Sequence, residues 1–420
     1  MANRAAQAGR TLAEVRTEMM VRMMLALVLS GASVAAQDDD AGAKAREIWD
    51  VEALMSAPQV RPAPEEFTRE GLQAVFYDCL PWQGRPTRSF AWMGVPEVTP
   101  GESVPGMVLV HGGGGTAYSE WVRIWNERGY AAIAMDTCGC VSVREGEAGP
   151  WPRHEMGGPP GWGSWDQGEW PREDQWTWHA VGDILLAHSL LAAQPGVDPE
   201  RIGITGISWG GYLTSLVAGV DPRLKLAVPV YGCGFYPETV FHNQLDPMSE
   251  EHRANWLAWW DPSRYLPDAR MPMLWVNGTN DFAYWLPAFQ HSYRAAPGQH
   301  TLCVRVRMGH SHVAGWAPEE IYAYADGILK GARPLARVVA QGREGARVWM
   351  RVECPAALEA AELHYTCDTG DWPEREWLTV PAKMAGAMVS AAVPEEATVW
   401  YLSVTDERGL LVSGEHEERR

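Results

Sequence analysis

The sequence predicts an α/β protein in which helices flank a mainly parallel, doubly wound sheet, followed by a small C-terminal β-sandwich. Between residues 104 and 332, short apolar runs alternate with helical stretches, which is typical of strand–helix units. Gly, Asp, Asn or His follows each run within a few residues. Beyond residue 331 the helical pattern stops and apolar residues alternate with polar ones, a period typical of strands.

Six strands of the parallel sheet can be assigned from their apolar runs, at residues 106–110, 131–135, 202–205, 226–230, 273–276 and 301–306. Open α/β sheets bind ligands outside the carboxyl ends of their strands, so the residues after these runs are candidates for a site. Residues 149–174, rich in Gly, Pro and Trp, lie between the second and third strands. We expect them to form a long ordered loop near the mouth of that site.

Four segments are expected along the chain. Residues 1–36 have the parts of a secretory signal peptide: Arg16 and Arg22, the apolar run 23–29, then small residues up to Ala36. Residues 37–103 are expected to supply an N-terminal arm and first strands that pack on a catalytic core at 104–332. Residues 333–420, with alternating runs at 346–352 and 398–404, are expected to form the sandwich.

The leader predicts a secreted or periplasmic protein. Its basic part is long, so an internal Met19 or Met20 is an alternative start, and an amphipathic surface helix is the alternative interpretation. The apolar run is much shorter than the roughly 20 residues that cross a bilayer, so no membrane anchor is expected. The net charge of −18 argues against DNA, RNA and anionic membranes as partners, since they attract clustered Lys and Arg.

The seven cysteines are an odd number, so at least one thiol stays free in a monomer. Cys138, Cys140 and Cys233 follow predicted strands and are candidates for a disulfide in an exported protein. There is no Cys-x-x-Cys spacing, which makes a redox or zinc role the minor interpretation.

The pattern Gly-x-Ser-x-Gly at residues 206–210 places Ser208 between a predicted strand and a helical stretch. This is the setting of a nucleophile elbow, the sharp turn that exposes the serine of an α/β-hydrolase. The pattern alone is weak evidence for an elbow in a chain with 42 glycines. The surrounding strand and helix and the candidate partner residues must therefore decide whether Ser208 is a nucleophile.

The first partner is the His-Gly-Gly-Gly-Gly run at residues 111–115, directly after a predicted strand, where an oxyanion loop belongs in this fold. The backbone N–H groups of Gly112 and Gly113, with that of Trp209, are the predicted oxyanion donors. A flexible turn or a phosphate loop is the alternative, but no Gly-Lys-Ser/Thr follows.

Asp281 and His310 follow the last two predicted strands, in the order Ser, Asp, His that hydrolases of this fold use. His310 would exchange a proton with Ser208, and Asp281 would orient the imidazole. A loop-capping carboxylate is the alternative for Asp281. His312 is the alternative base, because a continuing strand would turn both rings to one side. A His-x-His pair can also bind metal, yet only Asp281 suggests a further ligand, so neither metal nor cofactor is expected.

With these residues in place, the chain resembles α/β-hydrolase esterases of the acetyl xylan esterase-like and dienelactone hydrolase-like kind, which are related to prolyl oligopeptidase catalytic domains. The best matches are residues 111–116, 135–139, 157–163, 206–212, 231–234 and 308–316. The resemblance implies Ser208 as nucleophile, Asp281 as acid and a histidine within 308–316 as base.

The 22 tryptophans favour a carbohydrate ester as substrate, because flat rings with a polar edge stack on sugar rings. Trp162 and Trp176 are the predicted substrate contacts, although packing in the core is the more common fate of such residues. The expected reaction is hydrolysis of a carboxylic, preferably acetyl, ester through an acyl-enzyme. A prolyl oligopeptidase-like peptidase and an inactive glycan-binding protein are the alternatives.

Overall fold

The computed structural model of the protein describes residues 43–144, 146 and 149–419. The predicted signal peptide at 1–36 lies outside these residues. Among the residues described, no helix is both long enough and apolar enough to cross a bilayer. All seven cysteines are described, and each is a free thiol, so the disulfide considered among Cys138, Cys140 and Cys233 does not form.

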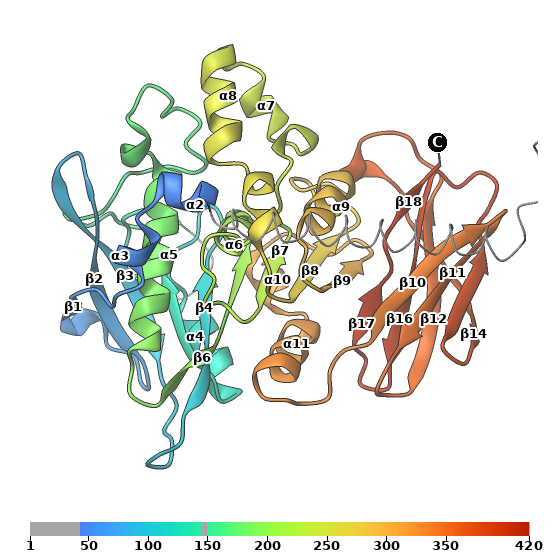
Figure 1. The fold of residues 1–420 in the computed structure, drawn as a ribbon, viewed down its shortest axis with the longest axis horizontal. Coiled ribbons are helices and arrows are strands. Elements are labelled where there is room, and N and C mark those ends of the chain that lie inside the picture. Colours follow the sequence, from blue (N-terminus) through green and yellow to red (C-terminus); the bar gives the residue numbers. More distant parts are fainter. Residues whose placement is uncertain (1–42, 145, 147–148, 420) are drawn as a thin grey trace, which may run out of the picture. The chain divides into compact units, whose positions relative to one another are not determined.

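Helices flank one large sheet in the region before residue 330 (Figure 1). The strands of this region are β1 (Val60–Pro62), β2 (Gln73–Trp82), β3 (Arg85–Gly94), β4 (Val104–Val110), β5 (Ala131–Met135), β6 (Val197–Ile207), β7 (Ala227–Val230), β8 (Met273–Gly278) and β9 (His300–Arg305). The helices are α2 (Ala43–Ile48), α3 (Val51–Leu54), α4 (Ser119–Glu127), α5 (Trp176–Ala192), α6 (Trp209–Val217), α7 (His242–Leu245), α8 (Glu250–Trp259), α9 (Leu286–Ala295), α10 (His312–Trp316) and α11 (Glu319–Leu329).

The sheet runs in the order β1-β2-β3-β5-β4-β6-β7-β8-β9. All pairs from β5 to β9 are parallel, whereas β1, β2 and β3 join the β5 edge in antiparallel pairs. Each of the six predicted strands is present, with ends shifted by a few residues. The carboxyl ends of the parallel strands therefore meet at one edge, and the loops after them can share a site.

Alternate residues of β4 face two separate apolar cores, as the two-residue period of a strand requires. Val108 and Val110 pack in the core that contains residues of α5, α6 and α9. Met107 and Leu109 pack in the core that contains residues of α4 and α11. Both faces of the sheet are thus covered by helices, which explains why its strands read as continuous apolar runs rather than as alternating ones.

The C-terminal strands form two antiparallel layers. These strands are β10 (Arg337–Glu344), β11 (Arg347–Glu353), β12 (Leu358–Thr366), β13 (Leu378–Pro381), β14 (Lys383–Ala385), β15 (Met388–Ala392), β16 (Val399–Asp406), β17 (Leu411–Ser413) and β18 (Glu417–Glu418). One layer is β10-β11-β15-β14, and the inward side chains Met350 and Val389 pack in the same core as Leu363 and Leu402 of the other layer. This is the predicted β-sandwich.

The second layer of the sandwich continues the large sheet, because β17 pairs antiparallel with β9 through Ser413 and Leu302. The Ser413 hydroxyl also accepts a hydrogen bond from the Val304 N–H at 3.0 Å. The sandwich therefore covers the exposed edge that β9 would otherwise present, a place where unpaired strands invite aggregation.

Candidate active site

Ser208 stands in a sharp turn between the last residue of β6 and the first residue of α6. Its backbone angles are φ 59° and ψ −116°, a conformation that residues with a side chain rarely adopt. The Ser208 N–H donates to the Val230 carbonyl at 3.0 Å, which ties the turn to the neighbouring strand. The side chain remains half-buried rather than enclosed, so its hydroxyl can meet a substrate. The predicted elbow is present in the structure.

Gly206 and Gly210, two residues before and after Ser208, pack so closely on backbone atoms that no side chain fits there. A Cβ built on Gly206 would lie 2.1 Å from the Gly210 carbonyl oxygen, and one built on Gly210 would lie 1.9 Å from the Val110 carbonyl oxygen. Backbone atoms of a strand and a helix cannot move aside cheaply. The elbow can therefore form only where both positions lack a side chain.

His310 links the serine to the aspartate. Its Nε2 lies 2.8 Å from the Ser208 Oγ, and its Nδ1 lies 2.6 Å from the Asp281 Oδ2. The three residues come from the loops after β6, β8 and β9. The structure brings together the serine, aspartate and histidine that the sequence singles out, in the geometry of a nucleophile, base and orienting carboxylate.

Backbone amides hold Asp281 in place. The Asp281 Oδ1 accepts hydrogen bonds from the N–H groups of Ala283 at 2.9 Å and Tyr284 at 2.7 Å, so the Oδ2 is left to face His310. Asp281 can therefore fill both of the roles considered for it. Its Oδ1 caps the loop, and its Oδ2 contacts His310. The side chain is buried, which strengthens its interaction with the imidazole.

Two aromatic rings flank the His310 imidazole. Tyr231 stacks on it with ring centroids 4.2 Å apart, and Phe282 lies against it at 4.5 Å. Phe282 is 56% exposed, whereas the His310 side chain is 13% exposed. The two rings restrict the orientation of the imidazole beside Ser208 and Asp281.

His312 lies elsewhere, because the strand ends well before it. The Ser311 hydroxyl accepts from the Ala314 N–H at 3.1 Å and caps α10, which begins at His312. The His310 and His312 rings therefore do not point to the same face of a strand, as a continuing strand would require. The His312 Nε2 accepts a hydrogen bond from the Gly112 N–H at 2.9 Å, within the glycine loop.

This contact corrects the prediction that Gly112 supplies an oxyanion donor, because its N–H is already engaged. Gly113 and Trp209 remain as the candidate donors. A Cβ on Gly112 would lie 3.0 Å from the Ser208 Cβ, and one on Gly113 would lie 2.7 Å from the Trp209 Cδ1. The glycine loop thus lies directly against Ser208 and Trp209.

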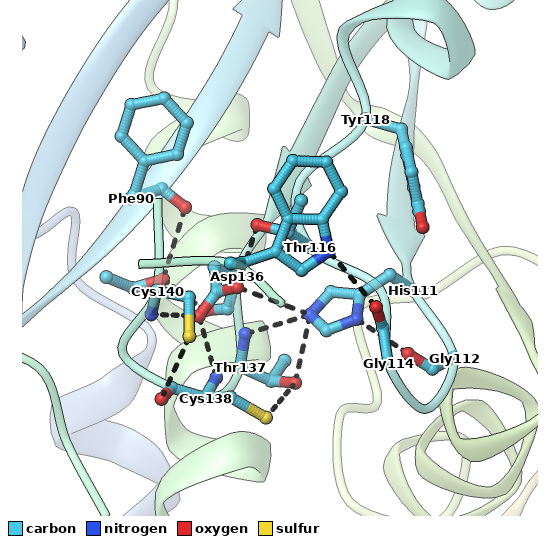
Figure 2. Close-up of polar contacts among 12 residues, drawn as sticks. Phe90, His111, Gly112, Gly114, Thr116, Tyr118, Asp136, Thr137, Cys138 and Cys140 are labelled. Carbon is cyan, nitrogen blue, oxygen red and sulfur yellow. Dashed lines mark hydrogen bonds and ion pairs between the residues drawn. The ribbon is translucent and has the colours of Figure 1, made fainter. Parts of the chain in front are cut away.

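His111 and Asp136 form a buried polar cluster behind the glycine loop, as Figure 2 shows. The His111 Nδ1–H donates to the Gly112 carbonyl at 2.9 Å, while its Nε2 accepts from the Thr137 N–H at 3.1 Å. Burial lowers the pKa of His111 to about 4, so the ring is neutral at pH 7. The only sequence signal for His111 and Asp136 is that each directly follows a strand at the carboxyl edge of the sheet, and this signal is weak.

Asp136 orders the loop after β5. Its Oδ1 accepts from the N–H groups of Cys138 at 2.8 Å and Cys140 at 2.7 Å, and its Oδ2 accepts from the Thr116 hydroxyl at 2.9 Å (Figure 2). Burial raises the pKa of Asp136, and these donors oppose the rise. The carboxyl joins the loops after β4 and β5 into one unit.

The two predicted substrate-binding tryptophans have different surroundings. Trp176 is 0% exposed and its indole N–H donates to the Thr137 carbonyl at 2.7 Å, so the prediction that it contacts substrate is wrong. Trp162 is half-buried and packs edge-on against His111 with ring centroids 5.6 Å apart. Packing in the interior explains Trp176, since large aromatic rings contribute strongly to cores.

The sandwich contacts the loop that carries Asp281. The Asn280 side-chain amide donates to the carbonyls of Pro373 at 2.9 Å and Arg375 at 2.7 Å, in the segment between β12 and β13. The C-terminal module therefore supports the residue next to Asp281. Within the described residues, no group of three or more His, Cys, Asp or Glu side chains is arranged to hold a metal ion.

Comparison with known proteins agrees with this architecture. Residues 163–326 match the model of the prolyl oligopeptidase family. An acetyl xylan esterase from Paenibacillus sp. R4 superposes with a TM-score of 0.53 at 21% identity, over 69% of this chain and 95% of the esterase. The chain has the α/β-hydrolase fold. The strand order and the Ser208 elbow at the carboxyl edge are those of an α/β-hydrolase sheet.

Two further matches are weaker. Acetyl xylan esterase 1 from a Thermoanaerobacterium species gives a TM-score of 0.49 at 15% identity, over 62% of this chain and 87% of that chain. A 4-O-methyl-glucuronoyl methylesterase from Podospora anserina is 39% identical over 54 residues. That match spans 13% of this chain and 11% of the methylesterase.

Proposed function

We propose that the protein is a serine hydrolase of carboxylic esters that acts through an acyl-enzyme on Ser208. The observation that carries the proposal is the continuous contact from Ser208 through His310 to Asp281, with distances of 2.8 and 2.6 Å. The half-buried serine in a strained turn and the glycine loop beside it support the same reaction.

In the proposed reaction, the Ser208 oxygen attacks the ester carbonyl carbon while the His310 Nε2 takes the hydroxyl proton. The negative charge that develops on the carbonyl oxygen is met by the N–H groups of Gly113 and Trp209. His310 then gives its proton to the departing alcohol oxygen, and the acyl group remains on Ser208. In the second half of the reaction, His310 takes a proton from a water molecule, and the water oxygen attacks the acyl carbon. The Ser208 oxygen leaves and takes the proton back from His310, which releases the acid and restores the serine.

We propose an acetyl ester on a carbohydrate as the substrate. Because His310 protonates the departing oxygen, the alcohol part of the ester must lie beside this ring, where Phe282 is 56% exposed. An exposed aromatic ring at this position offers a stacking surface for a sugar. The similarity to an acetyl xylan esterase favours the same substrate class, in which a sugar hydroxyl is the leaving group.

The similarity to a glucuronoyl methylesterase favours a second arrangement, in which methanol leaves and the sugar is on the acyl side. A methyl ester would place only a methyl group beside Phe282 and leave its exposed ring unused. The acetyl ester is therefore the better fit to this structure.

The test uses purified wild-type protein and Ser208→Ala with p-nitrophenyl acetate, acetylated xylan, methyl glucuronate and a proline-containing peptide. We expect turnover of the two acetyl esters, and loss of this turnover in Ser208→Ala. Turnover of the peptide in preference to the esters would instead support the prolyl oligopeptidase-like alternative that the family match favours. Saturable glycan binding without any turnover would identify an inactive binding protein.

The choice of base has its own test, the comparison of His310→Ala with His312→Ala. We expect His310→Ala to lose the serine-dependent turnover, because only the His310 ring meets both Ser208 and Asp281. Full loss in His312→Ala with retention in His310→Ala would show that the base is misassigned.

We also propose that the protein is exported after cleavage behind Ala36, on the sequence pattern of residues 1–36. Expression of the full chain in a secreting host should give a mature protein that begins at Gln37. N-terminal sequencing of cell-associated and exported material tests this. A full-length chain retained inside the cell would contradict it.

A further inference from the structure

The peptide groups on both sides of Gly112 are held by two histidines. The Gly112 N–H donates to the His312 Nε2 at 2.9 Å, and the Gly112 carbonyl accepts from the His111 Nδ1–H at 2.9 Å. The same carbonyl also accepts from the Gly115 N–H at 3.1 Å, which closes the glycine turn. Each polar group of Gly112 is therefore engaged, and both imidazoles are buried.

The glycine loop is shaped around the edge of the His312 ring. A Cβ built on Gly115 would lie 2.7 Å from the His312 Nε2, and one built on Gly112 would lie 3.2 Å from the same atom. Such distances are below ordinary van der Waals contact, so the two glycines leave space for the imidazole. The Tyr118 ring lies tilted against the imidazole at a centroid distance of 4.7 Å, and its hydroxyl is 3.3 Å from the His312 Nδ1.

These contacts determine where the Gly113 N–H points. A peptide unit is planar and trans, so its C=O and N–H point in opposite directions. The Gly112 carbonyl faces His111 and the Gly115 N–H, and the Gly113 N–H of the same unit must therefore point away from them. A Cβ built on Gly112 would lie 3.0 Å from the Ser208 Cβ, so the peptide unit that joins Gly112 to Gly113 lies close to Ser208.

We infer that His312 is a positioning residue for the oxyanion hole, holding the Gly112 backbone so that the Gly113 N–H faces the developing negative charge. The inference rests on the proposed esterase function. It assigns distinct roles to the two histidines of the His-x-His pair: His310 exchanges the proton, and His312 sets the electrostatic environment of the carbonyl oxygen. Only an unprotonated Nε2 can accept from the Gly112 N–H, so His312 acts in its neutral form.

The experiment compares wild type with His312→Gln, His312→Leu and the control Ser208→Ala, with p-nitrophenyl acetate as substrate. The glutamine amide oxygen can replace Nε2 as acceptor, whereas leucine fills similar volume without an acceptor. One oxyanion donor is worth about a hundredfold in rate. We expect His312→Leu to lower kcat by about that factor with little change in KM, and His312→Gln to recover at least about tenfold of the loss.

A second measurement separates positioning from general destabilisation. A boronic acid inhibitor forms a tetrahedral adduct on the serine, and its affinity should fall across the variants in proportion to kcat/KM, as expected for an interaction made in the transition state. Thermal unfolding of each variant shows whether the proteins remain folded at the assay temperature.

Wild-type kcat in a folded His312→Leu would overturn the inference and leave the proposed function intact. Equal losses in the Leu and Gln variants that follow their melting temperatures, with unchanged boronic acid affinity, would show a structural role only and would also overturn it. Absence of Ser208-dependent turnover in the wild type would overturn the proposed function, and this inference with it.

Discussion

Within the described residues, two histidine–aspartate pairs, His310–Asp281 and His188–Asp221, have nearly the same contact distance, and the His310 ring also lies beside the Ser208 hydroxyl. The His310 Nδ1 is 2.6 Å from the Asp281 Oδ2, and the His188 Nδ1 is 2.7 Å from the Asp221 Oδ2. The first pair lies in loops at the carboxyl edge of the sheet. The second joins α5 to the segment that follows α6.

The surroundings of the pairs separate their roles. Asp221 forms a salt bridge with Arg223 at 2.6 Å, and its hydrogen bonds to Arg223 and His188 hold the pKa of the carboxyl well below its usual value despite burial. Within the described residues, the His188 Nε2 has no hydrogen-bond partner, and the ring is 1% exposed. A histidine–aspartate contact is therefore not a catalytic feature by itself. It becomes one when the second ring nitrogen meets a nucleophile that a substrate can reach.

The same isosteric substitution in both pairs should give opposite results. Asp281→Asn is expected to lower kcat by roughly 10⁴-fold, because the amide no longer favours the tautomer that presents an unprotonated Nε2 to Ser208. Asp221→Asn is expected to leave kcat unchanged. Steady-state kinetics with p-nitrophenyl acetate on both variants tests the distinction, and similar losses in both would refute it.

Arg223 should matter for stability and not for activity. It donates to the Asp221 carboxylate and to the Ser189 hydroxyl at 2.8 Å, so Arg223→Met leaves a buried carboxylate without its cation. Breaking such a pair costs about 3 kcal/mol. Urea unfolding should show this loss, with kcat per folded molecule unchanged. An unaltered unfolding midpoint would mean that the salt bridge contributes little.

Stability should depend on pH through Asp221. Its folded-state pKa is lowered, so its contribution is present above the unfolded-state pKa of about 3.9 and is lost as pH falls below that value. Urea midpoints of wild type and Asp221→Asn should therefore converge between pH 5 and acid conditions below about pH 4. Curves that stay parallel over this range would exclude the carboxylate as the cause.

The smallest effect is expected at Phe282. Phe282→Ala removes an exposed ring beside His310, so the main loss should be in the binding of the alcohol part of the substrate. Stacking on an aromatic ring is worth about 0.5–1.5 kcal/mol, so KM for acetylated xylan should rise by up to about tenfold. The KM for methyl acetate, an acetyl ester with a small leaving group, serves as the control and should change less.

Much of the site could be predicted from the sequence because its residues follow strands that are easily recognised. Ser208, Asp281 and His310 each stand just after a buried apolar run, and the parallel arrangement brings those ends together. The alternation of apolar and polar residues with a period of two likewise predicts the separate antiparallel layer of the sandwich. Local patterns suffice where one element determines the position of one residue.

Other features depend on contacts between distant segments, and no local pattern contains them. His312 is an alternative to His310 only if the strand continues to it, but Ser311 caps a helix there. The acceptor for the Gly112 N–H comes from 200 positions away, so the loss of this oxyanion donor could not be foreseen. Tryptophan is a residue type that stacks on sugars, but whether Trp176 is exposed depends on the whole fold, which buries it completely. The pairing of β17 with β9 is a similar long-range feature.

Covalent labelling tests whether His310 activates Ser208. Wild-type protein, Ser208→Ala, His310→Ala and His188→Ala would be treated with a fluorophosphonate, with the rate followed by intact mass and the site by peptide mapping. We expect a single adduct on Ser208, formed at the same rate in wild type and His188→Ala, much more slowly in His310→Ala and not at all in Ser208→Ala. An adduct on another residue, or equal rates in His310→Ala and wild type, would contradict it.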